Sequence, residues 1–304
     1  MFGLINLHKP PEFTSHDCIA KLRKLLNTRK IGHGGTLDPA ATGVLPIAVG
    51  KATRLLQFLP EHKVYRALIR LGVTTTTDDL EGDIIHAADC SQIESEAIAR
   101  YLNDFVGEIE QVPPIYSAIK QKGRKLYELA RQGEEVVVEP RQVFIEQIKL
   151  LGISKTEFWE VEVEISCGPG TYIRSIARDL GEKLGVGGTL ANLVRTESCG
   201  LSLASSLDFA EIEAQLAQQT FSLIEPSLAL NHLARATITV DDAKCWCQGQ
   251  LVDLSQAVSC SQEITFSSEY YLTTYAVERR FLGISILYQR DGVLKLKPKV
   301  VLAA

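Results

Sequence analysis

The sequence predicts an α+β protein, with a large domain built on a mixed sheet with flanking helices and a small C-terminal β module. The chain has 304 residues, which exceeds the size at which one hydrophobic core usually stops growing. Segments of alternating apolar and polar residues, typical of strands, are interleaved with segments of helical spacing. From residue 236 onward, short strands and turns predominate. We place the large domain at residues 1–230 and the small module at residues 231–304.

Helix and strand are predicted in turn along the first third of the chain. Residues 15–30 have apolar side chains at helical spacing, and Ser15 is of a type that caps helix N-termini. Residues 63–73 alternate and are rich in strand-forming residues, whereas "TTTTDDLEGD" after them is typical of a polar loop. Helical spacing returns at residues 93–105.

Two strands and two helices are predicted for the rest of the large domain. Residues 143–153 and 157–168 alternate and should be neighbouring strands, the second ending in the turn "CGPGTY". Residues 172–185 form an amphipathic helix, and another helix is predicted at residues 208–217. In the small module, which we expect to be all β, the dipeptide Asp291-Gly292 predicts a hairpin turn.

Charge is distributed unevenly along the chain. The net charge is −5, yet residues 18–37 carry five cations and no acid, while residues 78–110 carry ten acids and one base. Residues 113–139 combine prolines, a basic cluster and a short helix expected near 124–131, and we interpret them as an insertion into the large domain. A basic run is most often a solvated helix face, so these cations do not by themselves establish nucleic-acid binding.

The cysteines and the apolar segments indicate in which cellular compartment the protein works. Seven cysteines, odd in number and scattered, argue against a disulfide framework and for a reducing environment. Cys245 and Cys247 lack a second pair at zinc spacing, so no structural metal is expected. The sequence has no long apolar run and no signal-peptide pattern at its start. We therefore expect a cytoplasmic protein that does not enter a membrane.

Glycine-rich stretches raise the question of a nucleotide site. The P-loop pattern fails because Leu45 stands where its first glycine is required. The dinucleotide-binding fingerprint fails because Leu37 and Leu190 stand where its third glycine is required. ATP and NAD sites are excluded, and no cofactor is expected.

The stretch "IGHGGTLDPAATGVLP", residues 31–46, holds a single acid, Asp38, between a glycine-rich approach and Pro39. Such a loop is often a structural turn with a surface aspartate. Here Leu37 and Val44 can bury the sides of the segment, and Pro39 favours an extended backbone at Asp38. Because an unpaired buried charge is costly, Asp38 is expected to have a cationic partner.

Five motifs occur in the order seen in bacterial TruB-type tRNA pseudouridine synthases: "HKP" at 8–10, "GHGGTLDPAATGVLP" at 32–46, "YRA" at 65–67, "PPIYSAIKQKGRKLYELAR" at 113–131 and "GTYIRSIARDLGEKLG" at 170–185. The chain resembles that family over roughly residues 1–200. The resemblance implies a pseudouridine-synthase-like fold, a PUA-like C-terminal module, a monomer, and no further protein partner. It also implies isomerisation of uridine 55 in the T loop of tRNA, with the T loop and stem as binding partner.

The resemblance also implies roles for individual residues. Asp38 becomes the catalytic aspartate, Arg174 its cationic partner that lowers the Asp38 pKa, and Tyr65 the aromatic residue that stacks on the base. Tyr172 and Leu193 line the base pocket, and His33 props the flipped RNA. The backbone of the RNA is contacted by the basic insertion through Lys120, Lys122, Arg124 and Lys125.

The chain departs from the family pattern at a few places. Gly34 stands where the family commonly has threonine, which predicts a more flexible loop, and Val194 stands where a second arginine is common, which removes one possible phosphate contact. An RNA-binding or RNA-folding protein without catalysis uses the same basic surfaces and is the alternative. A glycosidase requires a second acid, and the sequence shows no paired carboxylate near Asp38.

Overall fold

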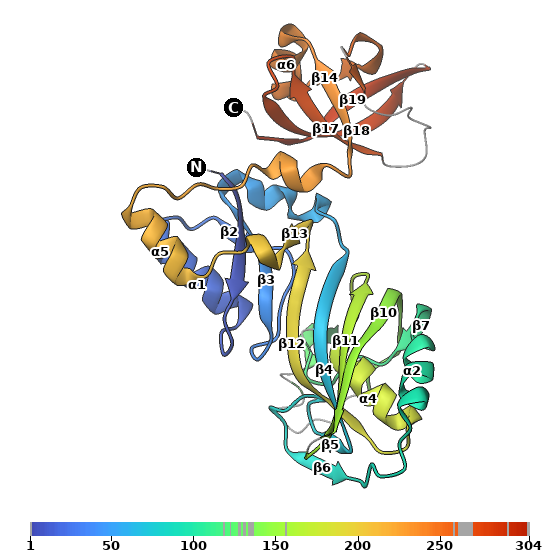
Figure 1. The fold of residues 1–304 in the computed structure, drawn as a ribbon. Coiled ribbons are helices and arrows are strands. Elements are labelled where there is room, and N and C mark those ends of the chain that lie inside the picture. Colours follow the sequence, from blue (N-terminus) through green and yellow to red (C-terminus); the bar gives the residue numbers. More distant parts are fainter. Residues whose placement is uncertain are drawn as a thin grey trace.

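Nine of the described strands form one mixed sheet (Figure 1). The computed structural model describes residues 2–302 except 118, 122, 127–128, 130–131, 133–136, 156, 258, 261–269 and 291. The strand order is β1-β3-β12-β4-β11-β10-β7, with β2 paired to β3 and β13 to β12; only β12 and β3 pair in parallel. Their bounds are β1 (Gly3–Lys9), β2 (Ile31–His33), β3 (Thr42–Val49), β4 (Lys63–Leu71), β7 (Gly107–Gln111), β10 (Arg141–Lys155), β11 (Trp159–Cys167), β12 (Gly188–Ser198) and β13 (Leu201–Ser202).

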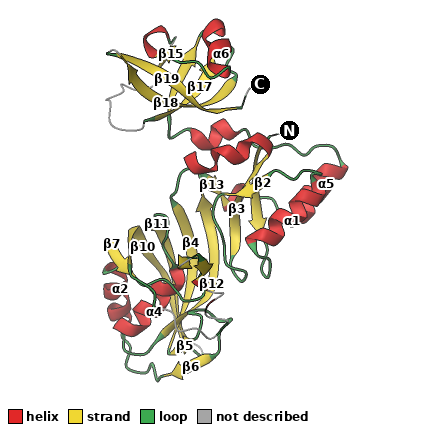
Figure 2. Ribbon diagram, turned by 180° about the vertical axis from the view of Figure 1, so that it is seen from behind, coloured by secondary structure: helices red, strands yellow, loops and turns green. Residues whose placement is uncertain are grey.

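Helices cover the two ends of this sheet separately. α1 (Ser15–Leu25) and α5 (Phe209–Ala217) bury their apolar side chains with those of β1 and β3. α4 (Ile173–Lys183) packs on β4 and β12, and α2 (Ser95–Asn103) packs on α4 and β10, over a second apolar cluster to which β11 also contributes (Figures 1 and 2). Two short hairpins accompany the sheet: β5 (Val73–Thr75) with β6 (Ile84–Ala87) follows β4 in the chain, and β8 (Lys120–Gln121) with β9 (Arg124–Lys125) lies between β7 and β10.

The helices and strands predicted for the large domain are confirmed outside residues 113–139, with one correction at the start of α1. Strands β10 and β11 pair antiparallel as expected, and β4 pairs with β11 on its other side. The N-cap of α1 is Thr14, not Ser15: the Thr14 hydroxyl accepts the Asp17 N–H, and the Asp17 side chain accepts the Thr14 N–H in a capping box. Ser15 is instead buried and serves the loop of Asp38.

The described residues of the C-terminal module form a six-stranded sheet in the order β15-β19-β18-β17-β14-β16. The 3-10 turn η2 (Leu203–Ser205) precedes α5, and the 3-10 turn η3 (Pro226–Leu230) leads from α5 into the module. The hairpin predicted around Gly292 joins β18 and β19. The expectation of an all-β module is wrong, because the Thr239 hydroxyl caps a helix, α6, whose Trp246 fills the module's core. The bounds are β14 (Ala234–Ile238), α6 (Val240–Cys247), β15 (Val252–Asp253), η4 (Leu254–Gln256), β16 (Ser259–Cys260), β17 (Tyr271–Ala276), β18 (Phe281–Arg290) and β19 (Val293–Val301).

The module docks on the large domain through apolar and polar contacts. Phe58 of η1 (Gly50–Phe58) stacks edge-on against Tyr271, with ring centroids 5.0 Å apart. Lys51 and Arg54 of the same turn donate to the carbonyls of Leu302 and Val301 at 3.1 Å each. The end of β19 is therefore tied to η1.

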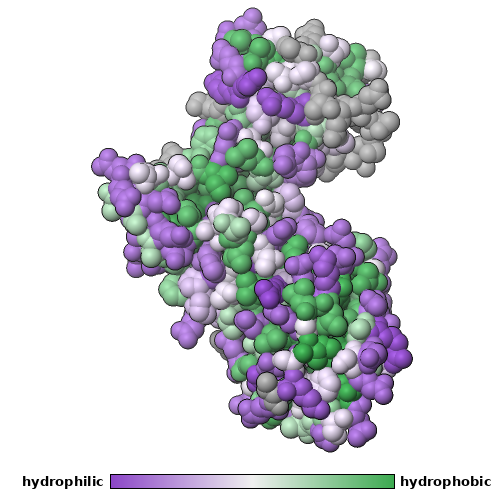
Figure 3. Space-filling view, viewed as in Figure 1, coloured by the Kyte–Doolittle hydropathy of each residue, from purple (hydrophilic) through white to green (hydrophobic). Residues whose placement is uncertain are grey.

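Hydrophilic residues cover most of the outline of the face in Figure 3, and hydrophobic residues gather over the body of the large domain. Across the described ranges, no helix combines the length and the apolar character that a bilayer crossing requires.

Candidate active site

Asp38 lies in the loop that joins β2 to β3, and buried partners fix the backbone on both sides of it. The Ser15 hydroxyl accepts the Leu37 N–H at 2.9 Å. On the other side, the fully buried Lys9 ammonium donates to the Pro39 carbonyl at 2.9 Å and to two further backbone carbonyls. Burial lowers the pKa of Lys9 to about 8. The "HKP" lysine thus shapes the strand end and anchors the loop.

Arg195, on β12, holds the same loop from inside the protein. Its Nε donates to the Val44 carbonyl at 2.8 Å, Nη1 to Thr36 at 3.2 Å and Nη2 to Gly35 at 3.0 Å. The residue is 0% exposed, and across the sheet it lies opposite Tyr65. One planar guanidinium therefore fixes the loop before and after Asp38 and ties it to the strand of the stacking tyrosine.

We expect Arg195→Met to lower the free energy of unfolding by about 3 kcal/mol or more, because three carbonyls lose a charged donor in a buried site. Denaturant unfolding measures this change. Arg23→Met is the matched control: Arg23 is exposed and makes one long hydrogen bond, 3.4 Å, to a carbonyl of β2. Equal stability of the two variants would contradict the bracing role of Arg195.

Glycines let the loop approach these partners closely. At Gly43, where φ is 101°, a Cβ would lie 2.2 Å from the Arg195 carbonyl oxygen. At Gly34, a Cβ would lie 2.9 Å from Cys199 Sγ, and this thiol donates to the Gly34 carbonyl at 3.3 Å. The space next to Gly34 is therefore filled by a buried thiol, which restrains the loop that the glycine was expected to loosen.

Arg174, in the first turn of α4, gathers the polar groups of the site. Its Nη2 lies 3.0 Å from Asp38 Oδ2, and its Nη1 lies 3.3 Å from Asp79 Oδ2. The same nitrogens donate to the carbonyls of Thr77, at 3.2 Å, and Tyr116, at 3.1 Å. The side chain is only 6% exposed, so Arg174 is not a helix-surface residue. The predicted pairing of Asp38 with Arg174 is confirmed in geometry.

Asp79, like Arg195, is a residue of this site that the sequence did not reveal, and the expectation that no second carboxylate lies near Asp38 is wrong. It is 8% exposed, in the segment read as a polar loop. Its Oδ1 accepts the Thr77 hydroxyl and the Glu81 N–H, and its Oδ2 faces Arg174. Both oxygens are thus occupied, which indicates that Asp79 orients Arg174 and does not act as a second free acid.

The Asp38 carboxyl is surrounded by protein, but its side chain is still 38% exposed because it faces a cavity. Burial raises the pKa of Asp38 above the usual aspartate range, and the Arg174 guanidinium opposes this by favouring the charged form. The expectation that Arg174 sets the Asp38 pKa below its ordinary value is therefore wrong in its net direction. The neighbouring Asp79 charge also raises the Asp38 pKa.

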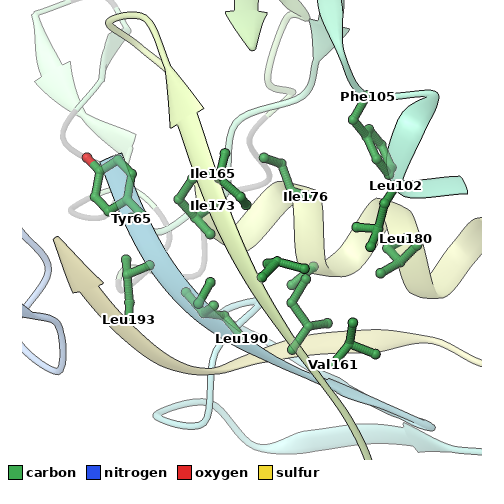
Figure 4. Close-up of a cluster of buried hydrophobic side chains, with 14 of the residues drawn as sticks. Tyr65, Leu102, Phe105, Val161, Ile165, Ile173, Ile176, Leu180, Leu190 and Leu193 are labelled. Carbon is green, nitrogen blue, oxygen red and sulfur yellow. The ribbon is translucent and has the colours of Figure 1, made fainter. Parts of the chain in front are cut away.

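The structure brings the predicted substrate-binding residues together around a cavity of about 1150 Å³. Leu193 contributes to a smaller adjoining pocket that also touches Asp38 and Arg174. In Figure 4, Tyr65 and Leu193 lie at one end of a cluster of buried side chains, and the tyrosine hydroxyl points away from the cluster. The predicted residues that line the larger cavity are Asp38, His33, Tyr65, Tyr172 and Arg174.

Local contacts orient the aromatic and imidazole side chains. Gln111 accepts the Tyr172 N–H at 2.8 Å and donates to the Tyr172 carbonyl at 3.1 Å, which holds the N-cap of α4. His33 Nδ1 accepts the Gly35 N–H at a long 3.4 Å, so it caps its own loop in part. Burial lowers the pKa of His33, which favours the neutral imidazole, and raises the pKa of Tyr65.

The basic insertion is described only in part. Lys122 lies outside the described residues, and for Lys120 and Lys125 the structure describes the backbone alone. Arg124 is exposed and contacts Gln132. Arg124 and Lys125 form a strand where a helix was expected to begin, and most of the remaining helix positions lie outside the described residues.

Comparisons with known proteins agree with this geometry. The model of the "TruB family pseudouridylate synthase (N terminal domain)" matches residues 23–173. A tRNA pseudouridine synthase B from Gloeothece citriformis is 52% identical over 307 residues, covering 100% of this chain and 98% of the relative. The protein of that name from Synechocystis is 45% identical and covers 99% of this chain and 100% of the relative. Among solved structures, a Cbf5-Nop10-Gar1 complex contains a chain that matches with a TM-score of 0.74 and 26% identity, covering 99% of this chain and 85% of that one.

The mixed sheet, the C-terminal β module and an arginine-bound aspartate that lines a large cavity define a pseudouridine synthase. This confirms the predicted fold class, including the PUA-like character of the module, and the predicted class of isomerase. With relatives about half identical along the whole chain, the protein belongs to the TruB family of pseudouridine synthases.

Proposed function

We propose that this chain isomerises uridine 55 in the T loop of tRNA to pseudouridine, with Asp38 as the catalytic residue. The observation that carries the proposal is the Asp38 carboxylate, held 3.0 Å from Arg174 at the wall of a cavity that Tyr65 also lines. Relatives that share about half of the sequence are named tRNA pseudouridine synthase B, which supports tRNA as the substrate.

The reaction breaks the bond between uracil N1 and the ribose C1′ and forms a bond between C5 and C1′. The proton on C5 is lost, and N1 gains one, so that the product is an isomer of the substrate. Asp38 is suited to three roles: it can stabilise positive charge at the sugar, add covalently, or accept a ribose proton. Each of these roles requires the ionised carboxylate, which the Arg174 guanidinium favours.

A uridine within a folded loop cannot reach Asp38, so the base has to leave its stack and enter the cavity. Stacking of the base on Tyr65 would contribute about 1–3 kcal/mol. Tyr172 and Leu193 complete the walls of the base pocket, and His33 lines the larger cavity, where it can prop the opened RNA. We assign the binding of the T loop and stem to the surface around this cavity.

The basic insertion is assigned to the RNA backbone. We expect neutral replacement of Lys120, Lys122, Arg124 and Lys125 together to weaken tRNA binding and to flatten its dependence on salt, by about 0.7 in logarithmic slope for each lost phosphate contact. Binding measured over a range of salt concentrations checks this. The control neutralises four cations that already pair with acids: Arg66, Arg70, Lys149 and Lys183. Equal slopes for both quadruple variants would overturn the assignment.

The domain assignment follows the two sheets. We propose residues 1–230 as the catalytic domain and residues 231–304 as an RNA-binding module that acts with it, since η1 and β19 hold the two together. We further propose that the protein works as a cytoplasmic monomer, without a protein partner or a cofactor.

The proposed reaction is tested with RNA that carries tritium at uracil C5. Because C5 forms the new bond to the sugar, turnover releases the label into water. We expect release from a T-arm stem-loop in the absence of added nucleotide or metal, and none from an anticodon stem-loop. Tight binding of the T arm without release of tritium would favour the non-catalytic RNA-folding alternative and overturn the proposal.

A further inference from the structure

Lys63 opens strand β4 and lies beside the stacking tyrosine. Side chains two residues apart on a strand share a face, so Lys63 continues the row of Tyr65, Ala67 and Ile69. The three later members of the row belong to the apolar cluster, whereas Lys63 lies one step beyond it and lines the large cavity. The Lys63 ammonium is therefore at the end of this row of side chains, next to the substrate cavity and outside the apolar cluster.

The other cations of β4 form ion pairs with carboxylates, whereas Lys63 forms none with a residue that the structure describes. Arg66 lies 2.6 Å from Glu162, and Arg70 lies 2.8 Å from Glu160, both on the opposite face of the strand. Lys63 lies across the sheet from Cys167 on one side and Ser198 on the other, and both are buried. Among the residues that the structure describes, no carboxylate forms an ion pair with the Lys63 ammonium.

A second cation lies close to Lys63. The Lys63 Cε and the Arg195 Nη1 are each 3.6 Å from the point where a Cβ on Gly35 would stand, so the two side chains converge on this glycine. Burial lowers the pKa of Lys63, and the Arg195 charge lowers it further. A partly buried ammonium beside a second cation is stabilised by an anion. The Glu61 carboxylate favours the charged form of Lys63 but does not offset the burial, because the pKa of Lys63 stays lowered.

The cavity is lined by charges of both signs. Asp38, Asp79 and Glu81 are among its acids, and Lys63 reaches it beside Gly35. Tyr65 and Lys63 are about 6.6 Å apart along the strand, a separation of the order of that between a base and its own phosphate. A nucleotide with its base against Tyr65 and its sugar at Asp38 can therefore direct a phosphate toward Lys63.

We propose that Lys63 binds the backbone phosphate next to the extruded uridine. This inference rests on the proposed function, and it adds a phosphate subsite within the catalytic cavity, separate from the basic insertion. The Lys63 ammonium binds the phosphate of the nucleotide. This interaction positions the sugar at Asp38.

The experiment combines a protein change with a substrate change. The T-arm stem-loop is prepared with a neutral methylphosphonate at the phosphate on the 5′ or the 3′ side of the target uridine. We expect one of the two neutral linkages to weaken binding to the unaltered protein by roughly 10- to 100-fold, the range for a lost hydrogen bond between charged groups. Lys63→Met is expected to weaken binding of the natural RNA by a similar factor and to show no further loss with that linkage.

Controls separate this inference from a structural effect and from the proposed function. Arg66→Met, on the same strand but on the opposite face, should lose affinity for the neutral linkage as the unaltered protein does. The inference is overturned if neither linkage weakens binding to the unaltered protein, or if the losses from the variant and the linkage add. Failure of the unaltered protein to form pseudouridine would instead contradict the proposed function.

Discussion

Asp38→Asn is expected to abolish pseudouridine formation, with a rate loss of at least about 10³-fold, while tRNA binding is retained. The amide keeps the size of the side chain but cannot stabilise a cation, add to the sugar or accept a proton as a carboxylate does. Binding should persist because the stacking and phosphate contacts come from other residues around the cavity. Single-turnover rates and equilibrium binding of the same RNA give both quantities.

The matched control is Asp104→Asn. Asp104 also pairs with a cation of α4, since its Oδ2 lies 3.0 Å from Lys183 Nζ, but it is exposed and does not line the cavity. We expect this variant to react at the rate of the unaltered protein. Substantial turnover by Asp38→Asn would remove Asp38 from the catalytic role.

Arg174→Met is expected to lower the reaction rate by about 100-fold or more and to move the acid limb of the pH profile to higher pH. Burial already raises the pKa of Asp38, and Arg174 is the strongest group that opposes this rise. Removing the guanidinium leaves the Asp38 pKa higher still, so a smaller fraction of the carboxyl is ionised at a given pH. Activity should therefore fall as the pH drops through this raised pKa, earlier in the variant than in the unaltered protein.

Arg178→Met tests whether the effect belongs to the site or to the helix. Arg178 lies one turn further along α4 and is also largely buried, with contacts to Asp78, Asp179 and the Val112 carbonyl. Replacing Arg178 should lower the free energy of unfolding but leave the acid limb of the pH–rate profile where it is. If Arg174→Met leaves the acid limb where it was, the guanidinium does not control the ionisation of Asp38.

The Asp38–Arg174 pair could be predicted because each of the two residues lies in a recognisable sequence motif. Asp38 stands alone among glycines and prolines, and Arg174 follows the turn that ends β11, so the sequence motifs locate both. The strands that carry Tyr65 and the sheet core were also predicted, because alternation with one buried face specifies a strand and its register.

The supporting residues could not be predicted because their partners are distant in sequence. Arg195 binds carbonyls more than 150 residues away, and nothing in its own strand distinguishes it from a surface arginine. Asp79 belongs to an acidic, polar stretch, and only the fold brings it to Arg174. The net shift of the Asp38 pKa likewise depends on how deeply the fold buries the carboxyl.

Two smaller corrections have local physical causes. Thr14 and Asp17 form a reciprocal capping box, and this places the N-cap of α1 at Thr14, one residue before the helix begins at Ser15. In the C-terminal module, the Thr239 cap and the burial of Trp246 favour a helix over a strand, although the segment is too short for its apolar spacing to be decisive.

Position-resolved mapping of pseudouridine in a full-length, unmodified tRNA transcript tests the central claim most directly. The unaltered protein and Asp38→Asn are each incubated with the transcript, without added metal or nucleotide, and the product is located by chemical labelling. The account predicts pseudouridine at uridine 55 of the T loop with the unaltered protein and none with the variant. Pseudouridine at another position, or at uridine 55 with both proteins, would contradict it.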